Sequence, residues 1–166
     1  MNYPKFTAWL LVALMALLVP MVPGGPIETR SFATVNSFLV MGFNIFLTLL
    51  MITSITTTYF MFKKQKWAYQ LVGILGLSFA LVFILDLAEI FPVSPDPMET
   101  PLLVLEWISL LMGALLMFFS YKSLTVTGQS YWSGAFKLPR WLIISIALLL
   151  LLGIYVVYFA TTSALS

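Results

Sequence analysis

Four charged side chains within or beside apolar stretches could form a polar cluster: Arg30, Asp86, Glu89 and Glu106. Asp86 and Glu89 are three residues apart, which places them on one face of a helix. Carboxylates inside apolar helices usually face a bundle interior or a watery cavity, where they have a partner. With Arg30 as that partner, we predict a cluster that either stabilises the fold or binds a cation or proton. The alternative is that Asp86 and Glu89 reach a membrane surface, where water solvates them.

A short polar phrase occurs twice, as PIET at residues 26–29 and as PMET at residues 97–100. We predict that each phrase opens a helix, because Thr29 and Thr100 can accept hydrogen bonds from free amides of a first turn. Glu28 and Glu99 would lie beside the positive helix ends. This structural account needs no ligand. The functional alternative is that the two helix entries face each other and form an outer vestibule.

A second short match supports an internal duplication. LVMG at residues 39–42 recurs as LLMG at residues 110–113, at the same offset as the polar phrase. We therefore predict that residues 6–62 and 67–124 are two helical-hairpin repeats, followed by an extra helix over residues 139–162. An even number of spans separates the repeats, so they would be parallel and related by an axis along the membrane normal.

A polar stripe interrupts the second apolar run. Asn36, Asn44 and Thr48 would lie on one helix face. In membranes such side chains most often form hydrogen bonds between helices. The alternative is that they line a pore.

The composition determines which elements must position these residues. The chain has 166 residues, of which 61% are hydrophobic and 8% are charged. Soluble domains carry about 25% charged residues, so this chain is expected to form a single membrane domain over residues 1–166. Five apolar runs are long enough to cross a bilayer: Phe6–Val22, Phe32–Phe62, Trp67–Phe91, Pro101–Leu124 and Pro139–Thr162. Because lipid cannot satisfy backbone groups, the predicted class is an all-α integral membrane protein with five transmembrane helices.

The first run resembles a signal peptide in having Lys5 before a short apolar core. No small-residue cleavage pattern follows it, so we expect this span to be retained.

The orientation follows from the distribution of positive charge. If the spans alternate, one side collects most of the cations: Lys5, Lys63, Lys64, Lys66, Lys122, Lys137 and Arg140. Arg30 lies on the other side. The positive-inside rule then predicts a cytoplasmic N-terminus and an outer C-terminus. We expect residues 125–138 to lie along the inner interface, and the membrane to be the plasma (inner) membrane or an equivalent energy-transducing membrane.

Residue types that are missing exclude several kinds of site. The chain has no Cys and no His, which excludes disulfides, thiol chemistry, the usual zinc sites and His-ligated haem. We predict no metal site and no cofactor. A net charge of +2 without a basic patch outside the membrane flanks also argues against binding of nucleic acid.

These features favour a non-catalytic accessory, assembly or scaffold subunit of a larger membrane complex. Its partners would be the lipid bilayer and either another membrane protein or a second copy of the chain. The alternative is a small oligomeric transporter or channel that attracts cations or protons to its acidic outer side. An intramembrane enzyme using Asp86, Glu89 or Glu106 as general acids ranks third, because no nucleophile–base pair accompanies these carboxylates.

The topology can be tested with single cysteines, because the native chain has none. We expect Ser94→Cys to react with an impermeant thiol reagent added outside intact cells. Gln65→Cys should react only after the cells are opened. Labelling of Gln65→Cys from outside would contradict the orientation.

Overall fold

The computed structural model describes residues 3–126 and 139–165, and this part of the chain folds into five α-helices and one short 3₁₀ helix. Their bounds are α1 Tyr3–Leu18, η1 Val19–Met21, α2 Ser37–Phe62, α3 Lys66–Leu87, α4 Thr100–Val126 and α5 Arg140–Ala164. Each α-helix is long and apolar enough to cross a membrane, α1 together with η1. The all-α class is thus confirmed for the described residues. Most of the predicted interfacial segment, residues 125–138, lies outside them.

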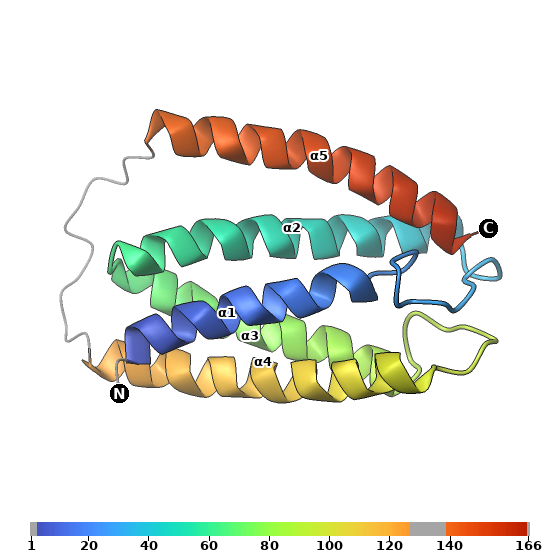
Figure 1. Cartoon of the computed structure of the whole chain (residues 1–166), viewed down its shortest axis with the longest axis horizontal. Coiled ribbons are helices and arrows are strands. Elements are labelled where there is room, and N and C mark those ends of the chain that lie inside the picture. The colour runs from blue at the N-terminus through green and yellow to red at the C-terminus, as the bar shows by residue number, and fades with distance from the viewer. Residues whose placement is uncertain (1–2, 127–138, 166) are drawn as a thin grey trace.

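The helices run side by side and alternate in direction, so the two chain ends lie at opposite ends of the bundle (Figure 1). The most extensive packing is between α3 and α4, and α1 packs against α4 and α2. The shared core includes the fully buried Leu11, Tyr69, Phe79 and Leu116. By contrast, α5 lies at the edge of the bundle, where it packs along α2.

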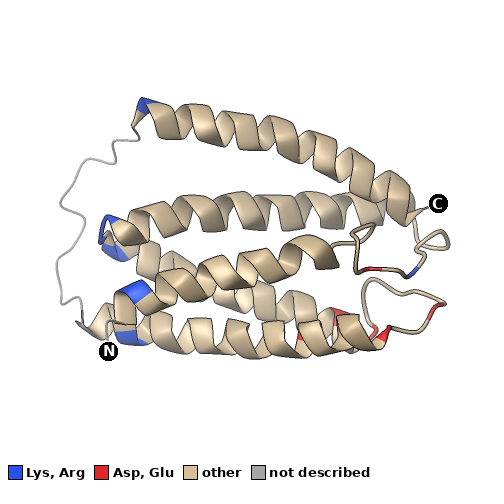
Figure 2. Ribbon diagram, in the orientation of Figure 1, with Lys and Arg blue, Asp and Glu red and all other residues tan. Residues whose placement is uncertain are grey.

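Charged residues gather at the two ends of the bundle (Figure 2). We call one the basic end, with Lys5, Lys63, Lys64, Lys66, Lys122 and Arg140. The other is the acidic end, with Glu28, Asp86, Glu89, Asp96, Glu99 and, as its one cation among the described residues, Arg30. Lys137, predicted to join the basic group, lies outside the described residues.

Small residues allow α3 and α4 to approach closely. A Cβ atom added at Gly76 would lie 3.2 Å from the carbonyl oxygen of Gly113 and 3.3 Å from the amide nitrogen of Met117. Backbone contact of this kind is a usual basis for helix association in membranes. The Ser120 hydroxyl adds a hydrogen bond to the carbonyl oxygen of Tyr69.

The predicted start of the second helix is wrong. The helix begins at Ser37 rather than near Phe32, and the Asn36 side chain caps it by accepting a hydrogen bond from the Phe38 amide (2.9 Å). Phe32 lies before the helix, and its apolar side chain packs with Val40 and Ala164 in a small separate cluster.

This boundary changes the predicted roles of three polar residues. Asn36 caps the helix, so it is not part of the polar stripe. Glu28 and Thr29 lie in the loop well before α2, so they do not form a helix mouth. The second phrase does stand where a helix begins, since Thr100 is the first residue of α4, while the capping role of its hydroxyl stays a prediction.

The predicted end of the third helix is also wrong. It ends at Leu87 rather than near Phe91, and Glu89 adopts a left-handed conformation (φ 53°) just after it. The Glu89 amide bonds to the Asp86 carbonyl oxygen and the Ile90 amide to that of Leu85, which is the Schellman arrangement that ends many helices. Glu89 therefore does not share a helix face with Asp86, and its side chain is exposed.

The close approach of α3 and α4 predicts that Gly76→Leu will destabilise the bundle. The added side chain must push one backbone away from the other, at a cost of about 1–3 kcal/mol in the free energy of unfolding. The matched control is Gly42→Leu on α2, where an added Cβ meets no atom within 4 Å. The free energy of unfolding measured in lipid should be lower for Gly76→Leu than for Gly42→Leu. Equal stabilities would contradict the described α3–α4 contact.

Candidate functional site

The loop between η1 and α2 carries two of the site residues. It folds back on itself, because the Ile27 amide bonds to the Pro20 carbonyl oxygen (3.1 Å). Gly24 lets it pass close to α5: its φ is +81°, and an added Cβ would lie only 2.2 Å from the Ala160 carbonyl oxygen. Both features require glycine. This path brings Glu28 and Arg30 to the acidic end with their side chains buried.

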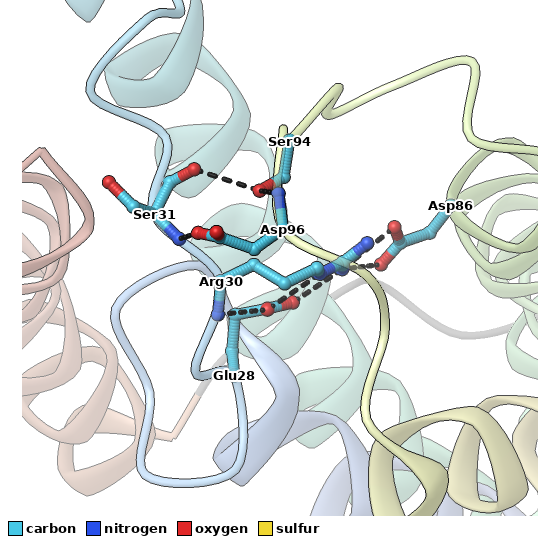
Figure 3. A network of polar contacts seen from close by, with 6 residues as sticks. All are labelled: Glu28, Arg30, Ser31, Asp86, Ser94 and Asp96. Atoms are coloured by element: carbon cyan, nitrogen blue, oxygen red, sulfur yellow. Dashed lines mark hydrogen bonds and ion pairs between the residues drawn. The ribbon is translucent and has the colours of Figure 1, made fainter.

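Arg30 bridges the loop and α3 (Figure 3). Its Nε and Nη2 atoms donate to the two carboxylate oxygens of Glu28 at 2.8 and 2.6 Å. Nη2 also donates to both oxygens of Asp86 at 2.9 Å. The three side chains are 3%, 1% and 11% exposed, in the order Arg30, Glu28, Asp86. We call Glu28, Arg30 and Asp86 the ion-pair cluster.

The charge on Arg30 is held by its partners. Burial alone would lower the pKa of the guanidinium. The hydrogen bond to Glu28 and the charges of Asp86 and Glu28 outweigh burial, so the pKa is raised above its ordinary value. Arg30 therefore stays charged over the physiological pH range. The Phe32 ring adds a cation–π contact, with its centroid 5.5 Å from the guanidinium carbon.

A second set of hydrogen bonds joins the two loops of the acidic end (Figure 3). The Ser31 amide donates to Asp96 Oδ2 at 3.0 Å, and the Ser94 hydroxyl donates to the Ser31 carbonyl oxygen at 2.9 Å. Ser94 also accepts from the Asp96 amide at 3.1 Å. The loop before α2 is thus fastened to the loop before α4, directly next to the ion-pair cluster.

Glu106 completes the cluster from α4. It is 1% exposed, and its carboxyl group faces that of Asp86 within hydrogen-bonding range, with Arg30 and Glu28 close enough to interact electrostatically. Its Oε2 atom has no hydrogen-bond partner among the described residues. A buried polar atom of this kind is costly unless something satisfies it.

The remaining polar stripe lies between α2 and α5. Asn44 Nδ2 donates to Thr161 Oγ1 at 3.1 Å, while Thr48 donates back to the Asn44 carbonyl oxygen at 2.8 Å. A Cβ at Gly153 would lie 2.7 Å from the Thr48 methyl group. Asn44 and Thr48 therefore take part in the contact between α2 and α5.

The structure brings together Arg30, Asp86 and Glu106 and leaves Glu89 outside, at the exposed end of α3. Glu99 and Thr100 are exposed, as is Thr29. Sequence reasoning missed Glu28 as the closest partner of Arg30, although its position two residues earlier in the same loop was a usable signal. It also missed the bridge made by Ser31, Ser94 and Asp96, for which the sequence gives no clear sign.

The arrangement limits the chemistry that the site can perform. Within residues 3–126 and 139–165, no group of three or more Asp or Glu side chains is placed to hold a metal ion. What the cluster shows is ion pairing, of Arg30 with Glu28 and Asp86.

Comparison with known proteins identifies a family but no activity. Residues 3–133 match the family model described as a domain of unknown function (DUF8051). No curated protein and no solved structure matches the chain.

The ion-pair cluster predicts that Arg30→Met will be strongly destabilised. Removing the guanidinium leaves Glu28 and Asp86 as buried unpaired charges, which should cost about 3–5 kcal/mol in the free energy of unfolding. Arg30→Lys keeps the charge but loses the fork that reaches both carboxylates, so its loss should be intermediate.

The control for Arg30→Met is Arg140→Met, at an exposed position of the basic end. It should change the stability by about 0.5 kcal/mol at most. Denaturant titration in lipid would give the free energy of unfolding of all three variants. Wild-type stability in Arg30→Met would mean that water solvates the two carboxylates.

Proposed function

The chain belongs to the DUF8051 family, and from the geometry of its own residues we propose that it is a non-catalytic integral membrane protein. In this proposal it serves as an accessory, assembly or scaffold subunit of a larger membrane complex. It spans the plasma (inner) membrane, or an equivalent energy-transducing membrane, with the basic end in the cytoplasm and the acidic end outside. Its two helical hairpins, residues 6–62 and 67–124, derive from a duplication, and α5 was added to them.

The observation that carries this proposal is the exposure of α5. Only 11% of the most apolar 18-residue stretch of α5 is buried inside the bundle, against 50% of the corresponding stretch of α3. Its two ends are nevertheless anchored. The Phe32 amide bonds to the Ala164 carbonyl oxygen at the acidic end, and the Trp141 ring meets the Tyr59 ring edge-on at the basic end.

The free face of α5 has the spacing of a helix contact. Leu148, Leu152, Tyr155 and Phe159 lie on one side of the helix, and each is more than half exposed. We call them the α5 outer stripe. In this proposal the α5 outer stripe packs against a partner helix in the bilayer, and van der Waals contact drives that association.

The ion-pair cluster also favours an accessory role over a transporter. Glu28 and Asp86 are satisfied by Arg30 within the chain, so these carboxylates are already paired without a substrate. In addition, α2 to α5 each run as one unbroken helix. Many transporters instead form their substrate sites at broken helices near the middle of the membrane.

The alternative function, a small oligomeric transporter or channel for cations or protons, is supported by one observation. Glu106 Oε2 is buried without a hydrogen-bond partner in the described part of the chain. An intramembrane enzyme stays third, because a carboxyl pair by itself specifies no reaction.

Site-specific photo-cross-linking tests the accessory role. We expect a photoreactive residue at Leu148 or Tyr155, introduced into the full chain in its native membrane, to give one discrete cross-linked protein. Both positions point away from α2 and are more than 60% exposed. They should give the same product, because they lie on one face of the helix.

Two positions provide controls. Leu111 on α4 is equally exposed but lies on another helix, and Leu142 on α5 is buried. Neither should give the discrete product. If Leu148 and Tyr155 label only lipid, as Leu111 should, the accessory role is wrong. A product made only of two copies of this chain would favour the oligomeric alternative instead.

A further inference from the structure

The charges around Glu106 do not balance. Three carboxyl groups (Glu28, Asp86 and Glu106) surround one guanidinium, so full ionisation would leave a net charge of −2 in a buried site. Arg30 directs its Nε and Nη2 atoms to Glu28 and Asp86. Glu106 is the carboxyl group that this arrangement leaves without a cation in contact.

The orphaned Oε2 atom of Glu106 gives independent evidence for a missing proton. It is buried and has no donor among the described residues, yet it belongs to a carboxyl group that faces Asp86. Two ionised carboxylates can only accept hydrogen bonds, whereas a neutral acid can also donate one. A single proton between Glu106 and Asp86 would therefore let one of the two carboxyl groups donate to the other and remove one unit of buried negative charge.

Among the described residues, the charged groups that act on Glu106 are Asp86, Arg30 and Glu28, and not Glu89, Asp96 or Glu99 of the neighbouring loops. The single charged residue of α1 in the structure is Lys5, and that of α5 is Arg140; both lie at the basic end, as does Lys122 of α4. The described α2 helix carries no charge, and apart from Asp86 the charge within α3 is Lys66 at the basic end. Titration of the pair would thus be governed by Glu28 and Arg30.

A polar pocket lies beside the ion-pair cluster at the acidic end. It has a volume of about 240 Å³ and is lined by residues of the loop before α2 and of the end of α5, among them Gly24, Thr29, Ser31 and Ser163. Glu28 and Arg30 also line it. They belong to both the pocket and the ion-pair cluster, so the pocket borders the cluster.

We propose that Glu106 and Asp86 form a proton-binding site that exchanges protons with water at the acidic end through the pocket lined by Glu28 and Arg30. The proton binds between the two carboxyl groups and returns to water when Glu106 ionises. Ionised Glu106 would then compete with Glu28 and Asp86 for Arg30. Proton release would therefore loosen the hold of α3 on the loop before α2.

Infrared spectroscopy of the full chain in lipid tests the site directly, because a protonated carboxyl group has its own C=O stretching band, which shifts in heavy water. Wild type should show this band at neutral pH and lose it on alkaline titration. Glu106→Gln should lack the band, since its neutral amide donates to Asp86 without a titrating proton. Glu99→Gln, at an exposed position, should keep the wild-type behaviour.

A second variant keeps the test independent of how Glu106→Gln folds. Asp86→Asn leaves Glu106 in place but changes its hydrogen-bond partner, so the band should change frequency. The proposal is overturned if folded wild type shows no such band at neutral pH, or if the neutral-pH band is unchanged in both Glu106→Gln and Asp86→Asn.

Discussion

Arg30 is buried against two carboxylates, and this one interaction governs the layout of the acidic end. A guanidinium that is 3% exposed in a largely apolar bundle must keep its partners, because an unpaired buried charge costs several kcal/mol. Glu28 comes from the same loop and Asp86 from α3, so the loop before α2 is drawn across the end of α3. The paths of the neighbouring segments follow from this pairing.

The pairing also reaches α5. The same loop passes Ala160 through Gly24 and bonds to Ala164 through the Phe32 amide. A helix with little internal packing is thereby held at a fixed place beside α2. Stability alone does not account for such a pair, since apolar replacements of buried ion pairs are often as stable. Fixing the position of α5 is the specific effect that the structure connects with it.

The sequence predicted the helices well because their apolar runs are long and lipid permits no other backbone structure. It predicted the start of α2 and the end of α3 poorly. Phe32 and Ile90 are as apolar as helix residues, but Phe32 lies in the loop before α2 and Ile90 follows the Schellman end of α3. The need of buried carboxylates for a cation was enough to predict the contact of Arg30 with Asp86. The choice of Glu28 over Glu89 depended on where α3 ends, which hydrophobicity does not encode. The duplication and the orientation remain predictions.

The most direct measurement is a double-mutant cycle between Arg30→Met and Asp86→Asn, from free energies of unfolding in lipid. Direct contact predicts a coupling energy of about 2 kcal/mol, within the range of neighbouring charged pairs. The same cycle between Arg30→Met and Glu89→Gln should be additive, because Glu89 is exposed beyond the end of α3. Additivity of the Arg30 and Asp86 changes within about 0.5 kcal/mol would show that the two side chains do not interact, and would contradict the account.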